Sequence, residues 1–425
     1  MFATSIIARK RDSQRLTGEE IRFMVEGFVA GEIPDYQMSA WAMAIVCRGM
    51  EVDEIAALTD VMLASGGRMS RATDRPRVDK HSTGGLGDKV SLVLSPLLAC
   101  FDVDVPMLSG RGLGITGGTL DKLEAYSGFR CHLTQPQIDR QLDRIGCVIA
   151  GTTADIAPAD RKLYALRDVT GTVPSIALIT SSIMSKKLAA SLDALVLDVK
   201  FGSAAFMRDL NQARQLADSL CATGQRFGVA TRAVLSDMNQ PLGRMVGNAC
   251  EANEAVQVLQ GAGPADVREL TLHLSAELLA AVGKFADCEL ARLALVEALT
   301  SGRALARFQA MVAAQGGQFD PQLELAPSST LTAPSCGWLQ QVDGQQIGQI
   351  VIGLGGGRTR LEQSIDHTVG LEMLVRVGDR IESQQPLVRI FARSPRAAER
   401  AATEILAAMT LAEQPVAPLP LIHTL

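Results

Sequence analysis

Residues 80–89, KHSTGGLGDK, bring a lysine, a histidine and two hydroxyl side chains together with three glycines. A β-like run precedes the glycines and a helical pattern follows them, which is typical of a strand, a loop and a helix in succession. Such a junction points free N–H groups and the positive end of a helix at one place, and glycine lets an anion approach the backbone. Lys80, Ser82 and Ser91 would add one charge and two hydroxyls. The stretch predicts a phosphate-sized anion site, and its alternative is a plain structural turn.

Residues 106–124, PMLSGRGLGITGGTLDKLE, repeat this pattern, with Ser109, spaced glycines and Thr119 near the start of a helix. Two such junctions in one sheet face a common crevice at the carboxyl ends of the strands, where α/β proteins bind ligands. The first stretch is not the GxxxxGK[ST] pattern of a Walker nucleotide loop. The loose GxGxxG-like spacing of the second lacks an acidic ribose partner about 20 residues further on. The pair therefore favours an anion site over a dinucleotide site.

Residues 164–200 contain a second kind of candidate site. Ser182 and Lys186 are four residues apart, so they share one face of a helix, and Arg167 precedes them. An arginine, a lysine and a hydroxyl suit the edge of a pyrimidine base, with donors for its carbonyl oxygens and an acceptor for its ring N–H. The alternative is that Arg167 pairs with a carboxylate such as Asp168 and that Lys186 is solvated. Of the five histidines, His81 is the one inside a candidate site.

The periodicity of the chain predicts the elements that must position these side chains. Residues 1–67 have helical periodicity, and Thr17 and Glu20 have the spacing of a capping box. From about residue 72, short apolar runs alternate with glycine-rich turns and helical segments, which predicts a mostly parallel sheet. The expected fold class is α/β, with a small all-helical domain, a larger α/β domain and a β-rich C-terminal unit. The expected boundaries are 1–67 and 157–190 for the helical domain, 72–154 and 192–330 for the α/β domain, and 336–425 for a C-terminal α+β unit.

Composition excludes several classes of partner. The 425 residues are 47% hydrophobic and 20% charged, with a net charge of -5, so there is no basic excess of the kind that nucleic-acid binding requires. The longest apolar stretches, such as 91–100, are far shorter than the roughly 20 residues of a membrane span. The N-terminal basic cluster follows a short apolar run, the reverse of a secretory signal, so we expect a cytoplasmic protein. Eight scattered cysteines without a CxxC pair indicate reduced thiols.

Several long stretches occur in a fixed order over nearly the whole chain. They are DKHSTGGLGDKVSL, SGRGLGITGGTLDKLEA, APADRKLYALRDVT, SSIMSKK, LDALVLDVKFGSAAFM and SDMNQPLGRMVGNACEANEA. These stretches resemble the signature sequences of the thymidine and pyrimidine-nucleoside phosphorylases. The resemblance implies a homodimer whose subunits each have a small helical domain and a larger α/β domain, separated by a cleft.

The resemblance also implies a reaction and a site. Members split a pyrimidine (deoxy)nucleoside with inorganic phosphate as co-substrate and without an organic cofactor; for thymidine the products are thymine and 2-deoxy-ribose 1-phosphate. The residues expected to bind phosphate are Lys80, Ser82, Ser91, Ser109 and Thr119. The residues expected to bind the base are His81, Arg167, Ser182 and Lys186. Of these, His81, Arg167 and Lys186 would also stabilise the charge that grows on the departing base.

Three positions bear on substrate and on cleft closure. Ile115 replaces a histidine that in the family fastens the closed cleft, and Ala204 replaces a usual glycine. Met107 stands where members that also use uridine tend to have lysine, so the resemblance favours 2′-deoxynucleosides such as thymidine. Some relatives bind potassium through backbone carbonyls, and the matching positions here are Gly87, Lys89, Leu242, Met245 and Glu254.

Other functions stay open on the sequence alone. The nearest is a broad pyrimidine-nucleoside phosphorylase that also uses uridine. A nucleotide-specific phosphorylase would need a further basic cluster, and a phosphoribosyltransferase would need an acidic magnesium site near the glycines. A non-catalytic nucleoside-binding homologue would explain Ile115 and Ala204, but it would have no need to retain the polar residues of both candidate sites.

Overall fold

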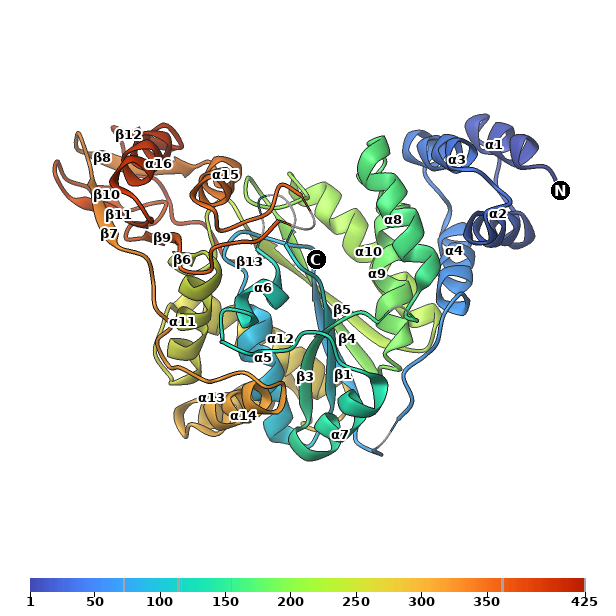
Figure 1. Cartoon of the computed structure of the whole chain (residues 1–425), viewed down its shortest axis with the longest axis horizontal. Coiled ribbons are helices and arrows are strands. Elements are labelled where there is room, and N and C mark those ends of the chain that lie inside the picture. Colours follow the sequence, from blue (N-terminus) through green and yellow to red (C-terminus); the bar gives the residue numbers. More distant parts are fainter. Residues whose placement is uncertain (72, 113–114, 116, 154, 361–362, 424–425) are drawn as a thin grey trace.

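A computed structural model describes residues 1–71, 73–112, 115, 117–153, 155–360 and 363–423 (Figure 1). Six of its helices form a helical lobe: α1 (Ala3–Arg11), α2 (Gly18–Ala30), α3 (Asp35–Arg48), α4 (Val52–Ala64), α8 (Pro158–Thr170) and α9 (Ile176–Ala189). The predicted capping box at the start of α2 is confirmed, because Thr17 and Glu20 bond to each other's backbone N–H groups. One hydrophobic core joins α2 and α3 with Leu163 of α8 and Leu178 of α9. Two segments of the chain that lie about 100 residues apart therefore pack as one lobe.

The α/β lobe is built on a central sheet, and the prediction of a mostly parallel sheet is confirmed. Its strands are β1 (Val78–Ser82), β2 (Val105–Ser109), β3 (Cys147–Gly151), β4 (Ala194–Phe201) and β5 (Ala230–Asp237). The pairs β1–β4, β4–β5 and β2–β3 are all parallel, and an isolated parallel bridge from Arg77 to Asp104 joins β1 to β2. Every residue of β3 and β4 is buried, as expected for strands covered on both faces.

Helices cover both faces of this sheet. Those that follow the strands are α5 (Val90–Leu98), η1 (Ala99–Phe101), α6 (Thr119–Leu123), α7 (Gln135–Ile145) and α10 (Leu210–Arg226). Four further helices lie between β5 and the C-terminal unit: α11 (Asn248–Leu259), α12 (Ala265–Ala281), α13 (Cys288–Thr300) and α14 (Arg303–Ala314). In Figure 1, α5 and α12 lie on one side of the strands, and α9 and α10 lie on the other. None of the described helices is both long and apolar enough to cross a membrane.

The C-terminal unit is rich in β-structure. It contains β7 (Ser328–Thr332), β8 (Gly337–Val342), α15 (Gly344–Leu354), β9 (Gly370–Met373), β10 (Arg380–Ile381), β11 (Pro386–Phe391), α16 (Pro395–Ala407) and β12 (Met409–Ala412). The α/β lobe contributes β6 (Met245–Val246) to one of its sheets, in the order β6-β9-β11-β7. In return, β13 (Ile422–His423) adds an antiparallel edge to the central sheet beside β5. These exchanges tie the C-terminal unit to the α/β lobe at two places.

Candidate active site

A cavity of about 430 Å³ lies at the carboxyl ends of β1 and β2, with walls from both lobes. The α/β lobe contributes all five residues expected to bind phosphate, namely Lys80, Ser82, Ser91, Ser109 and Thr119. The helical lobe contributes Asp160, Arg161, Tyr164, Ile183 and Lys186, and His81 lines the cavity from β1. The structure thus brings the five residues expected to bind phosphate together with His81 and Lys186 in one cavity, at the carboxyl ends of the parallel strands.

Strand and helix ends position the hydroxyl groups of this cavity. Ser82 and Ser109 are the last residues of the parallel strands β1 and β2. Ser91 is in the first turn of α5, and Thr119 is the first residue of α6. Unpaired backbone N–H groups at the start of a helix favour an anion, and the macrodipole of the longer helix α5 adds to this preference. The geometry is therefore suited to hold a phosphate.

A buried charge network surrounds Lys80. Its ammonium is closed to solvent and lies 3.4 Å from Asp88 and 3.6 Å from Asp198. Lys200 lies 2.9 Å from the same oxygen of Asp198. Burial opposes ionisation of Asp88, but the ammonium groups of Lys80, Lys200 and Lys122 hold its pKa far below the usual value. Asp88 is therefore ionised throughout the physiological range, and its carboxylate holds the Lys80 side chain in place.

Lys186 provides a second cation on the opposite wall. Its ammonium lies 2.5 Å from Asp160 and donates to the hydroxyl of Ser182 at 3.0 Å. The other carboxylate oxygen of Asp160 is buried and has no hydrogen-bond partner among the described residues. Because an ammonium has three donors, Lys186 retains one for a ligand, while Ser182 contributes by orienting Lys186. Ser182 itself does not line the cavity.

His81 is a neutral hydrogen-bonding group in this site. Burial and the nearby ammonium groups of Lys187, Lys186 and Lys80 lower its pKa well below the usual value. A neutral imidazole has one N–H donor and cannot act as a strong acid at neutral pH. His81 could act either as a proton donor or as a hydrogen-bond donor, and the electrostatics favour the hydrogen-bond donor.

Arg167 lies elsewhere than the sequence suggested. Its side chain is buried and does not line the cavity. The guanidinium donates to three backbone carbonyls, those of Thr172 at 3.2 Å, Leu178 at 3.1 Å and Val173 at 2.8 Å. Arg167 therefore holds the connection between α8 and α9, because each donor is aimed at a carbonyl of that turn or of the first turn of α9.

Three acidic or basic residues of the site were missed by the sequence reasoning. Asp160 and Asp88 belong to stretches already singled out, and an acidic residue in the first turn of the α8 segment was the available signal for Asp160. The sequence pattern singles out Lys186 but not its neighbour Lys187. The Lys187 ammonium lies 2.6 Å from Asp79 and donates to the carbonyls of Lys80 and Leu108, both at 3.3 Å. Lys187 thus fastens α9 to the ends of β1 and β2.

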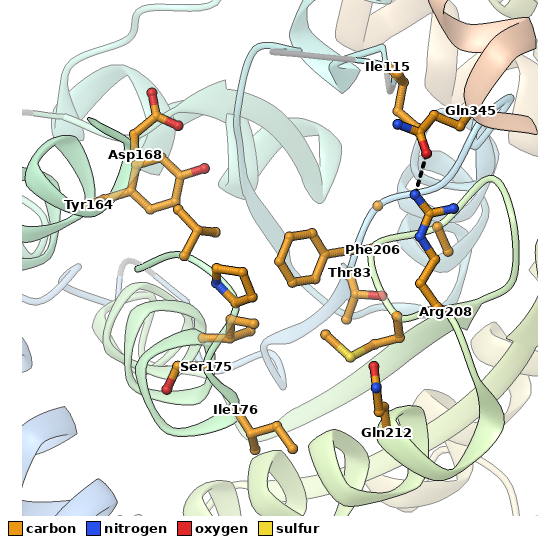
Figure 2. A pocket seen from close by; sticks show the side chains of 16 residues that line it. Thr83, Ile115, Tyr164, Asp168, Ser175, Ile176, Phe206, Arg208, Gln212 and Gln345 are labelled. Atoms are coloured by element: carbon orange, nitrogen blue, oxygen red, sulfur yellow. Dashed lines mark hydrogen bonds between the residues drawn. The ribbon is translucent and has the colours of Figure 1, made fainter. Parts of the chain in front are cut away.

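A wider hollow of about 920 Å³ adjoins the cavity, and Tyr164 lines both. Figure 2 shows Tyr164 and Asp168 on one wall, Phe206 near the centre, and Arg208 with Gln345 on the opposite wall. Arg208 donates a hydrogen bond to Gln345 of α15, so the C-terminal unit forms part of this wall. The side chains of Tyr164 and Phe206 are about half exposed, which leaves two aromatic surfaces available to a planar ligand.

Both departures from the family pattern contact the same helix, α15. A Cβ atom on Gly344 would lie 2.2 Å from the Cβ of Ala204, and one on Gly348 would lie 2.7 Å from the Cβ of Ile115. These glycines are four residues apart, so they share one helix face. Ile115 and Ala204 are therefore apolar contacts for the C-terminal unit. Residues 113–114 and 116 of the GITGG region lie outside the described residues.

The positions expected to bind potassium contain an ammonium group instead. Lys89 donates to the carbonyls of Leu242 and Met245, both at 2.9 Å, and lies 2.5 Å from the carboxylate of Glu254. Its own carbonyl accepts from the N–H of Leu92 in the first turn of α5. The expected ligands thus do not fit a metal ion in this structure, because the Lys89 side chain already uses them. Gly87 contacts Leu242 through its backbone, with φ at 77°.

Three family models and several curated proteins match this chain. The chain matches the glycosyl transferase family models for the helical bundle domain at residues 4–66 and the a/b domain at residues 74–305. Residues 338–412 match the pyrimidine nucleoside phosphorylase C-terminal domain. Curated pyrimidine-nucleoside phosphorylases from Geobacillus stearothermophilus and Staphylococcus aureus (strain MSSA476) are each 45% identical to it, over 92% of both chains.

A solved structure shares the fold at low identity. Anthranilate phosphoribosyltransferase from Thermus thermophilus superposes with a TM-score of 0.59 and 20% identity, covering 73% of this chain and 99% of the other. At this identity the likeness describes the architecture of the lobes alone. The acidic residues near the glycine loop of the present chain, Asp88 and Asp198, are paired with Lys80 and Lys200.

Proposed function

Because the chain belongs to the pyrimidine-nucleoside phosphorylases of the glycosyl transferase family, we propose that it splits pyrimidine 2′-deoxynucleosides with inorganic phosphate, and thymidine in particular. The products are then thymine and 2-deoxy-ribose 1-phosphate. One observation carries the proposal: a single cavity has an anion cradle on the α/β lobe and a lysine with a free donor on the helical lobe. A nucleoside between these walls would have its sugar carbon facing the phosphate and its base facing Lys186.

The charges of the site suggest how the reaction proceeds. A phosphate held by Lys80, Ser91 and Thr119 attacks C1′ of the sugar as the glycosidic bond breaks. The electron pair of that bond passes to the base, which becomes negatively charged. Lys186 and His81 donate hydrogen bonds to the base as this charge grows, and a donor placed in advance is worth a few kcal/mol of barrier. Because the donors lie on different lobes, we propose that the lobes close before the bond breaks.

Arg167 is a further proposed contact to the base. The Arg167 nitrogen that donates to the carbonyl of Val173 lies at the edge of the wider hollow, because Val173 lines that hollow. A base carbonyl could accept from this nitrogen in place of Val173 once substrate has closed the site. In the structure itself, Arg167 contributes by fixing the turn that leads into α9.

The preference for a 2′-deoxy sugar rests on Met107. This side chain is fully buried in β2, and it places no charge next to Ser109 at the end of the strand. The alternative is a broad phosphorylase that also uses uridine.

The deciding experiment measures base release from thymidine, 2′-deoxyuridine and uridine, with and without inorganic phosphate. We expect phosphate-dependent release from the two deoxynucleosides and slow release from uridine. Equal use of uridine would reject the interpretation of Met107, and no release from any nucleoside would reject the catalytic function.

We expect the pH dependence to show no ionisation of His81 between about pH 6 and 9. Its pKa is lowered, so the neutral form that supports activity is present above the depressed pKa and is lost as pH falls through that value. The test compares kcat/KM profiles of the wild type and His81→Gln, which keeps an N–H donor. The two profiles should have the same shape, with the variant lower by about tenfold or less. The ionisation of phosphate affects both proteins equally. If kcat/KM of the wild type instead fell as the pH rose through about 7, and that of the variant did not, His81 would act in its protonated form.

We also propose that two copies associate through the helical lobe. Several exposed large apolar side chains belong to this lobe, among them Phe2, Val29, Tyr36 and Met43. Apolar side chains of this size that stay exposed in one lobe favour an interaction surface. A mass measurement in solution, with Tyr36→Glu for comparison, checks this: the wild type should be a dimer, and a monomeric wild type would reject the proposal.

A further inference from the structure

The Lys89 ammonium lies at the junction of three segments of the α/β lobe. Lys89 directly precedes α5, the helix whose first turn carries Ser91 to the phosphate cavity. Its partners are Leu242 in the segment before β6, Met245 at the start of β6, and Glu254 in α11. Figure 1 shows α5 and α11 side by side below β6, where the α/β lobe meets the C-terminal unit. One cation therefore joins the phosphate loop to the segment that supports the C-terminal unit.

All three donors of this ammonium are satisfied. Two point to the carbonyl oxygens of Leu242 and Met245, and the third points to Glu254. The side chain of Lys89 has no exposure to solvent, and that of Glu254 has 3%. Glu254 is itself held in place, because it accepts hydrogen bonds from the backbone N–H groups of Arg244 and Met245 at 3.0–3.2 Å. This is a closed cage of oxygen atoms around one positive charge.

The cage has the chemistry of a monovalent-cation site. Backbone carbonyl oxygens are the ligands that replace the hydration shell of potassium, and one carboxylate balances a single charge. Gly243 is part of the fit, because a Cβ atom there would lie 2.3 Å from Glu254 and 2.9 Å from the Lys89 ammonium. A potassium ion beside the ammonium would place two cations within a few ångströms of each other with one carboxylate between them. Mutual repulsion excludes this arrangement.

We propose that the ammonium group of Lys89 is a built-in monovalent cation, which takes the place that a potassium ion would otherwise fill. The protein consequently needs no added monovalent metal to order its phosphate loop. Removing the side chain leaves two carbonyls and the charge of a buried carboxylate without their cation, and a cation of similar size can then occupy the space. Replacement of Lys89 by a small residue should therefore create a dependence on potassium.

The first arm of the test uses the unchanged protein. Thermal unfolding is followed in KCl and in tetramethylammonium chloride at equal ionic strength, because tetramethylammonium is too large to enter the cage. We expect the same unfolding midpoint and the same KM for phosphate in both salts. A midpoint that rises specifically with potassium would overturn the proposal, since it would show a metal site that Lys89 does not fill. The unfolding measurement does not depend on the proposed reaction.

The second arm uses Lys89→Ala. In tetramethylammonium we expect a lower midpoint and a raised KM for phosphate, because a buried carboxylate whose charge no cation balances is strongly destabilising. Potassium or ammonium ions should raise the midpoint in a saturable way, as a ligand that binds only the folded state does. Lithium, which holds its water more tightly, should fail. A variant that folds but gains nothing specific from potassium would overturn the proposal.

Two controls make the result specific to the cage. Lys10 forms an equally buried pair with Glu54, at 2.9 and 3.0 Å, and no carbonyl in the described part of the chain accepts from its ammonium. Lys10→Ala should therefore lose stability without rescue by potassium. The double variant Lys89→Met, Glu254→Gln removes both charges of the cage and should be insensitive to the choice of salt. Rescue of either control by potassium would contradict the assignment to Lys89, and if Lys89→Ala does not fold, the wild-type arm decides alone.

Discussion

Lys80→Ala is expected to lower kcat/KM for phosphate by about 10²–10³-fold, and most of this loss should appear as a raised KM for phosphate. The physical reason is that Lys80 lines the cavity and that Asp88 and Asp198, not solvent, hold its ammonium group in position. A cation held in this way needs no reorganisation when phosphate binds. The measurement is the rate of base release at saturating thymidine, recorded as the phosphate concentration is varied.

The controls for Lys80 separate binding from folding. Lys200 pairs with Asp198 at 2.9 Å without the help of Lys80, so we expect the fold of the variant to survive with a lower unfolding midpoint. Lys80→Gln removes the charge while keeping most of the volume, and it should have the same phosphate defect. Lys284→Ala removes a surface lysine that pairs with Asp102 and should leave the titration unchanged. An unchanged phosphate dependence in both Lys80 variants would reject its role.

The second large effect is expected at Lys186. Lys186→Ala should lower kcat for thymidine by about 10²–10³-fold, because it removes a donor that meets charge developing on the base. The loss should be smaller for 5-fluoro-2′-deoxyuridine, because fluorine lowers the pKa of the departing base and reduces its need for stabilisation. Rates of base release from both nucleosides, for wild type and variant, give this difference directly.

Structural damage would produce a different pattern at Lys186. A distorted helical lobe would slow both nucleosides by the same factor, so an equal loss would contradict the assignment to the leaving base. Lys162 is a matched control in the same lobe, because its ammonium lies over the ring of Phe28, 4.4 Å from the ring centre, and it does not line the cavity. Lys162→Ala should leave the ratio of the two rates unchanged.

The parts of the fold that could be predicted depend on short segments. The capping box of α2 involves two residues three positions apart, and Ser82 and Ser109 end strands that are recognisable from their own apolar runs. Parallel strands carry their carboxyl ends to one edge, so the meeting of the two glycine-rich junctions followed from the pattern alone. For these features the signal lies within a few residues, where periodicity and turn chemistry are informative.

The charge partners could not be predicted in the same way. Lys186 meets Asp160 across 26 residues, Lys187 meets Asp79 across 108, and Lys89 meets Glu254 across 165. No periodicity links such residues, since their contact depends on how whole helices pack against the sheet. Arg167 shows the same limit, because the sequence indicates its charge but not that three backbone carbonyls already accept its donors.

By itself, the sequence determined the α/β class with its helical lobe, the two glycine-rich junctions, and the family to which the chain belongs. Only the tertiary structure decided that His81 is neutral, that Asp88 and Asp198 hold Lys80, and that Lys89 fills a cation site with its own side chain. The reason is physical. Secondary structure follows from local sterics and hydrophobic periodicity, whereas protonation states and buried ion pairs follow from desolvation and from charges that distant segments bring together.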